Sequence, residues 1–427
     1  MSLRRPFYYG WAIVAVAWII YGFGISPAYY SWGFFSPEMI EDLGFSRART
    51  GAVFGLFTFL YSAVSPIVGG ALRLTTLRTL MTLGSLSTAL GLFLMSRADS
   101  LAECFLGFSI LGGVGIGFST ILPCQTLASN WFIRRRARAT AIIFTAGGVV
   151  GLIMQERIGP WLLRNWDWRR GWLLIAAISL SLAFVSALFV RDAPERLGLR
   201  PDGDPPDPPE SADPPGAAPT TSGPRIAPAA TAPEFTAAQA IRTPQFLLIT
   251  LGAASFSATW GGVAAHGRLH LEDLGFSIET AGGILGFMVL MSTVGRLAGS
   301  LGDFLPPQKV MGLSLILQAV GVGGVMLASS PGLARWMFVL VGLGFGSAYI
   351  CSAVVFAAYF GRRAFATTSG LRLLVTGVFN ALSPALAGRV YDRLGSYALA
   401  FIGLTAFSLL GAAACYFSRP PRLPAAR

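Results

Sequence analysis

Long apolar runs constrain this chain more than any other feature of its sequence. A helix of about 20 apolar residues spans a bilayer, and only helices and closed barrels satisfy their backbone hydrogen bonds within lipid. The chain has twelve such runs, at residues 9–36, 50–72, 79–96, 101–130, 139–163, 171–190, 245–266, 280–301, 310–329, 333–360, 366–388 and 397–418. Only 12% of its residues are charged, against about 25% in soluble domains. We therefore predict an all-α membrane protein with twelve transmembrane helices.

The first apolar run and the basic charge each have a second interpretation. The run at 9–36 is too long for a cleavable signal and lacks a small-residue cleavage site, so we expect it to be the first membrane helix. The formal charge of +12 could indicate a nucleic-acid partner. Most arginines, however, lie in short loops between apolar runs, where they set orientation in the membrane. Their modest excess on one side, strongest at 134–138, predicts cytoplasmic N- and C-termini and no nucleic-acid partner.

Residues 192–244 interrupt the apolar pattern. They hold 13 of the 26 prolines and almost no large apolar residues. Such a composition cannot bury a core, so we expect an extended or disordered cytoplasmic linker. The linker separates an N-terminal six-helix bundle, residues 1–191, from a C-terminal one, residues 245–427. A plain tether is the main interpretation, and a partner-binding segment is the alternative.

An internal repeat supports this division. The same Glu-Asp-Leu-Gly-Phe-Ser sequence begins at Glu41 and at Glu272, after the first helix of each half. A second related pair, Trp131–Thr140 and Tyr359–Thr367, lies between the fourth and fifth helices of each half. Two halves in the same order are parallel repeats, which transport proteins arrange around a central site near the bilayer midplane.

The loop after the second helix of each half resembles the signature loop of the major facilitator superfamily. In that loop a Gly is followed four residues later by Asp and then by basic residues. The C-terminal half carries it as Gly299 to Asp303, with Lys309 following. The N-terminal copy begins at Gly69 and has Arg73 in place of Asp. The resemblance implies the major facilitator fold, with two six-helix bundles. Because Arg73 replaces the Asp, the N-terminal loop is not expected to make the family's usual gating contacts.

Within that superfamily the chain is similar to bacterial monocarboxylate carriers and oxalate:formate antiporter-like proteins. Four stretches carry the similarity: Phe7–Trp11, Asn130–Gly151, Ala265–Ser277 and Tyr359–Phe401. The resemblance implies secondary active transport of small organic anions by alternating access. It also implies coupling to protons or to a counter-anion, a location in the bacterial inner membrane, and a monomer with neither cofactor nor enzymatic activity.

Three residues are candidates for binding the substrate, because ionisable groups inside lipid are costly and usually functional. Arg296 offers a permanently charged fork of donors that matches a carboxylate, and the resembled carriers place a substrate-binding Arg after Gly here. The alternative role of Arg296 is purely structural. The two repeats are offset by one residue near this position, and this offset is expected to rotate Arg296 by about 100° relative to the signature loop. Arg372 would add a second positive charge for a dianion, or would snorkel to the membrane surface. Tyr29 stands, with Tyr30, where the eukaryotic branch of the family has Lys.

Three further residues are candidates for coupling or gating. Glu156 is the one carboxylate well within an apolar run, and it would either carry a proton or form an ion pair with a neighbouring helix. His266 titrates near neutrality and would gate or relay protons, or else hydrogen bond to a loop at the rim. Asp303 belongs to the signature loop. Ser292 replaces the Asp that is thought to take the coupling proton in the eukaryotic branch, so the resemblance does not carry proton coupling over.

Two other functions compete with anion transport. Export of hydrophobic or cationic compounds would use Glu156 as the partner of the cation. An intramembrane enzyme would need a nucleophile paired with a base, or a metal cluster, and no run offers either. The four cysteines lie singly within apolar runs, so we expect no metal site and no disulfide framework.

Overall fold

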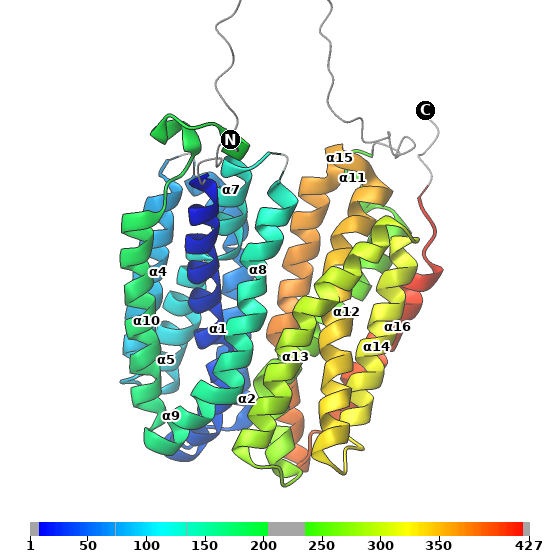
Figure 1. Ribbon diagram of the computed structural model, residues 1–427. Helices are drawn as coiled ribbons and strands as arrows, with labels where there is room; N and C mark the ends of the chain where they lie inside the picture. Colours follow the sequence, from blue (N-terminus) through cyan, green and yellow to red (C-terminus); the bar gives the residue numbers. More distant parts are fainter. Residues whose placement is uncertain (1–7, 73, 134, 204–234, 422–427) are drawn as a thin grey trace, which may run out of the picture.

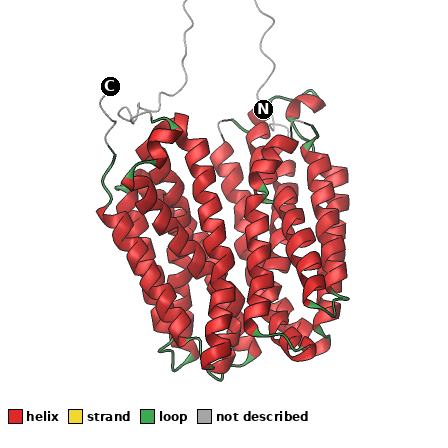
Figure 2. Ribbon diagram, turned by 180° about the vertical axis from the view of Figure 1, so that it is seen from behind, coloured by secondary structure: helices red, strands yellow, loops and turns green. Residues whose placement is uncertain are grey.

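The computed structural model describes residues 8–72, 74–133, 135–203 and 235–421, and all regular secondary structure within them is helical (Figures 1 and 2). Eleven helical segments are long and apolar enough to cross a membrane. A twelfth element, α2 with α3, completes the expected set at residues 47–71. The predicted all-α architecture with twelve spanning helices is confirmed in the described part of the chain.

The N-terminal bundle has six long elements, some of them interrupted by a change in helical winding. Its helices are α1 (Gly10–Leu43), α2 (Arg47–Ala63), α3 (Ser65–Ala71), α4 (Leu77–Met95), α5 (Leu101–Cys104), η1 (Phe105–Gly112), α6 (Gly113–Ser119), α7 (Ile121–Trp131), α8 (Arg136–Ile153), η2 (Met154–Ile158), α9 (Gly159–Asn165) and α10 (Trp168–Phe189). The segments α5 to α7 follow one another as a single span, as do α8 to α9.

The C-terminal bundle repeats this plan. Its helices are α12 (Pro244–Asp273), α13 (Ile278–Ala298), η5 (Gly299–Asp303), α14 (Pro307–Val325), α15 (Pro331–Leu394) and α16 (Ala398–Phe417). The long α15 is two membrane helices, because Gly361 adopts a φ of 71° and breaks the helix between 331–360 and 362–394. A left-handed residue of this kind favours glycine, which accounts for the Gly at this point of the repeated motif.

Turn chemistry explains the repeated Leu-Gly-Phe-Ser motif. Gly44 and Gly275 have φ values of 66° and 84°, so each ends its helix in the left-handed conformation. Two residues later, Ser46 and Ser277 accept hydrogen bonds from the backbone N–H groups of Arg49 and Thr280, both at 3.3 Å. These serines are the N-caps of α2 and α13. The motif therefore makes the sharp turn between the first two helices of each half.

The first and last described residues, 8 and 421, lie at one end of the bundle, which we call the terminal end, and the loops before α2, α10, α13 and α16 lie at the opposite, distal end (Figure 1). The two bundles meet through a related pair of contacts. Gly51 and Gly55 of α2 face the backbone of α15, and Gly282 and Gly286 of α13 face the backbone of η2 and α8. Both pairs have the Gly-x-x-x-Gly spacing, which permits close helix approach.

The expected linker is ordered at both of its ends, so the prediction of an extended or disordered segment across all of 192–244 is wrong there. Asp192 accepts a hydrogen bond from the Arg78 backbone, and Asp202 accepts one from the Ile133 backbone, both at 3.0 Å. Phe235 is fully buried against Phe360. The carboxylates satisfy backbone donors at helix starts and loops, which composition alone does not reveal. Residues 204–234 lie outside the described part.

Candidate functional site

A cavity of about 200 Å³ lies between the two bundles, near the middle of the membrane helices. Both bundles contribute aromatic and polar side chains to it: Tyr21, Tyr29, Tyr30 and Tyr61 from one, and Trp260, Tyr349 and Asn380 from the other. Arg296 and Arg372 supply its charge, and its lining includes no acidic side chain. The described lining therefore carries two positive charges with no carboxylate to balance them.

Arg296 extends from α13 into this cavity. Its guanidinium carbon lies 5.4 Å from the centre of the Tyr349 ring, and Tyr21 lines the same cavity. The Nε atom is buried and has no hydrogen-bond partner among the described residues. Despite the expected rotation, Arg296 lines the cavity; α13 is α-helical to Ala298, and the winding changes to a 3-10 helix only after it.

Arg372 reaches the same cavity from the second half of α15. It is 6% exposed, and its Nη1 donates a hydrogen bond of 3.0 Å to Ser352 Oγ. The guanidinium carbon lies 5.4 Å from the centre of the Phe356 ring, and Nε has no partner in the described structure. This is a buried arrangement that faces the cavity, and the snorkelling alternative is not what the structure contains.

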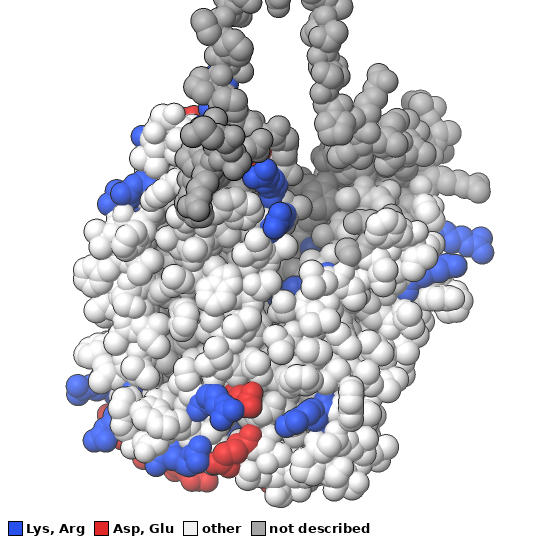
Figure 3. Space-filling view, viewed as in Figure 1, with Lys and Arg blue, Asp and Glu red and all other residues white. Residues whose placement is uncertain are grey.

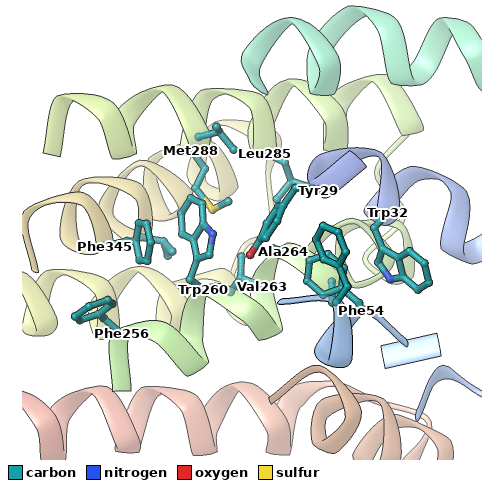
Figure 4. Packing of buried hydrophobic residues seen from close by; sticks show 14 of the residues in the cluster. Tyr29, Trp32, Phe54, Phe256, Trp260, Val263, Ala264, Leu285, Met288 and Phe345 are labelled. Carbon is teal, nitrogen blue, oxygen red and sulfur yellow. The ribbon is translucent and has the colours of Figure 1, made fainter. Parts of the chain in front are cut away.

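Tyr29 and Trp260 face one another across the bundle interface (Figure 4). The two residues occupy equivalent places in the internal repeat, since both are twelve residues before a Glu-Asp-Leu-Gly motif. Tyr29 packs its ring against Tyr30 and Phe54, each at 5.1 Å between ring centres. Trp260 stacks on Phe345 at 4.0 Å. The aromatic pair forms an apolar wall on the distal side of the two arginines.

A second hollow of about 690 Å³ adjoins the cavity and is also lined by Arg296, Phe144, Thr293 and Tyr349. Its other lining residues come from α7 and α8 and from α13 and α15, toward the terminal end. Figure 3 shows the bundles separated there, with basic side chains visible in the hollow between them. Arg296 therefore borders a route that leads from the central cavity to the terminal end.

The distal end is closed by contacts of Arg47 with the opposite bundle. Its backbone N–H and that of Ala48 donate to the two carboxylate oxygens of Asp392, at 3.0 and 2.9 Å. Its guanidinium donates to Asp273 at 3.0 Å and lies 3.6 Å from the centre of the Tyr391 ring. We call this set of contacts the distal seal. It joins two copies of the repeated motif, since Arg47 follows one copy and Asp273 belongs to the other.

His266 is connected to the distal seal by a directed chain of hydrogen bonds. Its Nε2 lies 2.8 Å from the Pro384 carbonyl oxygen, which can only accept, so Nε2 carries the proton. In the neutral ring Nδ1 then accepts from the Tyr397 hydroxyl at 3.0 Å. That hydroxyl in turn accepts from Arg47 at 3.1 Å. The residue is 2% exposed, so it is a buried connector within the bundle and not a histidine of the exposed rim.

Arg268, which the sequence analysis does not single out, forms a further bridge between the bundles. It is 3% exposed, donates to Glu272 at 2.7 Å and donates to the Phe34 carbonyl of α1. The apolar run predicted for this helix stops at residue 266, whereas α12 continues to Asp273. The longer helix places Arg268 within the packed interface, and a search for charges beyond the apolar run would find it.

Of the two remaining candidates, Glu156 is not part of the cavity lining. Glu156 is in η2, its side chain is 44% exposed, and its ion-pair partner among the described residues is the adjacent Arg157 at 3.9 Å, not a residue of a neighbouring helix. Asp303 ends η5, and its side chain lies outside the described structure. No group of three His, Cys, Asp or Glu side chains able to hold a metal occurs among the described residues.

Sequence comparison identifies a family and relatives that match most of the chain. The family model of the Major Facilitator Superfamily matches residues 7–371 and 289–427. Monocarboxylate transporter 13 of Bos taurus is 26% identical over 412 residues, which cover 94% of this chain and 88% of the relative. The hexuronate transporter of Escherichia coli (strain K12) is 22% identical over 395 residues, which cover 88% of this chain and 86% of the relative.

Solved structures show the same fold. A bacterial homologue of the human lysosomal transporter Spinster, in an inward-facing and unoccupied conformation, matches with a TM-score of 0.73 at 18% identity, covering 97% of each chain. The nucleoside transporter NupG matches with a TM-score of 0.71 at 14% identity, covering 95% of this chain and 100% of that one. The family match spans nearly the whole chain, and this multi-pass membrane protein therefore belongs to the Major Facilitator Superfamily, whose members are transporters and not enzymes.

Proposed function

We propose that this protein is a secondary active transporter that moves small, monocarboxylate-like organic anions across the bacterial inner membrane by alternating access. One observation carries the proposal: Arg296 and Arg372 line one cavity that has no acidic side chain. A buried charge without a partner is costly, and guanidinium groups bind carboxylates through paired hydrogen bonds. An anionic substrate would supply the missing partners, including acceptors for the two free Nε atoms.

The observed state supports alternating access with both termini in the cytoplasm. The hollow beside Arg296 leads to the terminal end, while Arg47 and Arg268 bridge the bundles toward the distal end. The excess of basic loops on the terminal side favours a cytoplasmic location for that side. In this orientation the structure is the inward-open state, and transport requires the distal seal to open while the route from Arg296 closes.

The cavity favours exchange against a counter-anion over coupling to protons. Its lining has no Asp, Glu or His that could release a proton on substrate binding. Reorientation of the empty cavity would move two unbalanced guanidinium groups, whereas an anion bound on each half of the cycle balances them. Export of a cationic compound would need a carboxylate in the cavity to pair with the cation, and the cavity lining has none. We further propose that a single chain forms the complete transport path.

Uptake into proteoliposomes tests the proposal. Vesicles preloaded with unlabelled oxalate or lactate are given labelled lactate, pyruvate or oxalate, with empty vesicles as the comparison. Loss of charge-assisted hydrogen bonds worth about 1.5–3 kcal/mol should weaken apparent affinity roughly 10- to 150-fold in Arg296→Ala and in Arg372→Ala. Arg242→Ala, at an exposed arginine of the terminal end, is the matched control. Uptake that is unchanged by Arg296→Ala would show that the anion site is assigned wrongly.

A further inference from the structure

An apolar groove of about 530 Å³ lies on the outer surface of the C-terminal bundle, away from the central cavity. The second half of α15 and the helix α16 form its walls, and Ala258 of α12 lies at its floor. Leu382, Leu386 and Leu399 line the groove and are each more than half exposed. None of these residues takes part in the transport site or the distal seal.

The groove exists because α15 and α16 each pack against α12 but make few contacts with one another. On α16, Gly403 borders the groove, and a side chain there would meet no atom within 4 Å. At the inner end, Phe379 and Phe407 close the groove with their ring centres 5.4 Å apart. The groove is therefore lined mainly by apolar side chains, with the two rings at its inner end.

The other end of the groove is basic. Arg389 and Arg393 lie one helical turn apart near the distal end of α15, and both are exposed and line the groove. Neither makes an ion pair with any described side chain. Two like charges at this spacing repel each other, so an anion placed between them would be favoured. The groove therefore combines an apolar slot with a site for negative charge at its mouth.

The dimensions match one leaflet of a bilayer. The position of Arg393 is 14 residues after that of Phe379, a helical rise of about 21 Å, and one leaflet with its headgroup region is about 20–22 Å thick. Arg393 lies one residue before the end of α15, at the level expected for lipid headgroups. An acyl chain can thus fill the slot while its phosphate lies at the arginines.

We propose that this groove binds an anionic phospholipid of the leaflet at the distal end, with one acyl chain in the slot and the phosphate between Arg389 and Arg393. The bound lipid would hold the same end of α15 that carries Asp392 and Tyr391 of the distal seal. The proposal is independent of the substrate that the central cavity takes.

Native mass spectrometry of the purified chain tests the proposal, with phosphatidylglycerol, phosphatidylcholine or inorganic phosphate added separately. Phosphatidylglycerol adducts should dominate. They should weaken about 30-fold in the Arg389→Gln, Arg393→Gln double variant, since each basic residue contributes about 1 kcal/mol at an anionic headgroup. Gly403→Leu should reduce binding by filling the slot, whereas Arg389→Lys, Arg393→Lys should retain it and show that the site is otherwise folded. Arg242→Gln is the control on a different surface.

Three results would overturn the proposal. Equal binding of phosphatidylcholine would remove the role of the negative headgroup. Unchanged phosphatidylglycerol binding in the Gln double variant or in Gly403→Leu would place the lipid elsewhere. Displacement of phosphatidylglycerol by millimolar inorganic phosphate would indicate a site for phosphate alone, without the acyl chain.

Discussion

Removal of the Asp392 carboxylate tests whether the distal seal holds the bundles in the observed state. Asp392 belongs to α15, yet its oxygens accept the N–H groups of Arg47 and Ala48 at the start of α2. Ser46 accepts only the next donor, that of Arg49, so the two caps do not duplicate one another. These N–H donors of α2 have their acceptors on the opposite bundle, and they lose those acceptors when the bundles separate. The Asp392 bonds therefore stabilise the distally closed state specifically.

The size of the effect follows from these contacts. A capping side chain contributes about 1 kcal/mol, and a negative charge at a helix N-terminus adds about 0.3–1 kcal/mol. Asp392→Ala should thus cost the closed state roughly 1.5 kcal/mol, which is about a 10-fold shift of the equilibrium toward distal opening. The Arg47 guanidinium keeps its bond to Asp273 in this variant, so the seal is weakened without being removed.

Spin-label distances across the distal end measure this shift. Labels at Arg97→Cys and Ser329→Cys lie on exposed distal loops of the two bundles, and the four native cysteines are buried. Asp392→Ala should raise the population with a long distance between the labels. The matched control is Asp192→Ala, because Asp192 accepts the backbone N–H of Arg78 at 3.0 Å within the N-terminal half of the chain. The reasoning fails if Asp392→Ala leaves the distances unchanged, or if Asp192→Ala shifts them as far.

Two other substitutions test the closed end with the same pair of labels. Gly55→Leu should populate the distally open state and slow transport, because a side chain at Gly55 meets the carbonyl group of Ala381 in α15. The control Gly70→Leu, where an added side chain meets no neighbouring atom, should change neither the distances nor transport. Equal effects of the two substitutions would argue against close packing as the cause. Tyr397→Phe removes the hydroxyl that links Arg47 to His266 and should shift the equilibrium roughly 5-fold, for a bond of about 1 kcal/mol. Tyr391→Phe is the control for Tyr397→Phe, since the Tyr391 hydroxyl makes only a 3.5 Å contact with Asp273. If Tyr391→Phe shifts the equilibrium as far as Tyr397→Phe, the hydrogen bonds of Tyr397 are not the cause.

The sequence predicts every spanning helix, and most of their ends to within a few residues, but α1, α12 and α15 continue six or seven residues beyond the predicted runs at their distal ends. Bilayer thickness fixes the length of an apolar run, and lipid forces the backbone to satisfy its own hydrogen bonds, so local composition is sufficient. The repeated Leu-Gly-Phe-Ser motif is also local, since a left-handed Gly and a capping Ser make the turn wherever they occur. The ordered ends of the linker escape this reasoning, because Asp192 and Asp202 are held by backbone donors distant in the sequence.

The candidate site is only partly contained in the sequence. The free-energy cost of placing a charged side chain in lipid identifies Arg296 and Arg372 as candidates from the sequence. Whether Arg372 snorkels or faces a cavity depends on which side of α15 meets the opposite bundle. The bonds of Arg47 to Asp392 and of His266 to Pro384 join residues more than a hundred positions apart. Sequence alone determined the helices and the duplication, because both follow from local composition and spacing. Tertiary structure decided which charges share a cavity and which end is closed, because those depend on how two complete bundles pack.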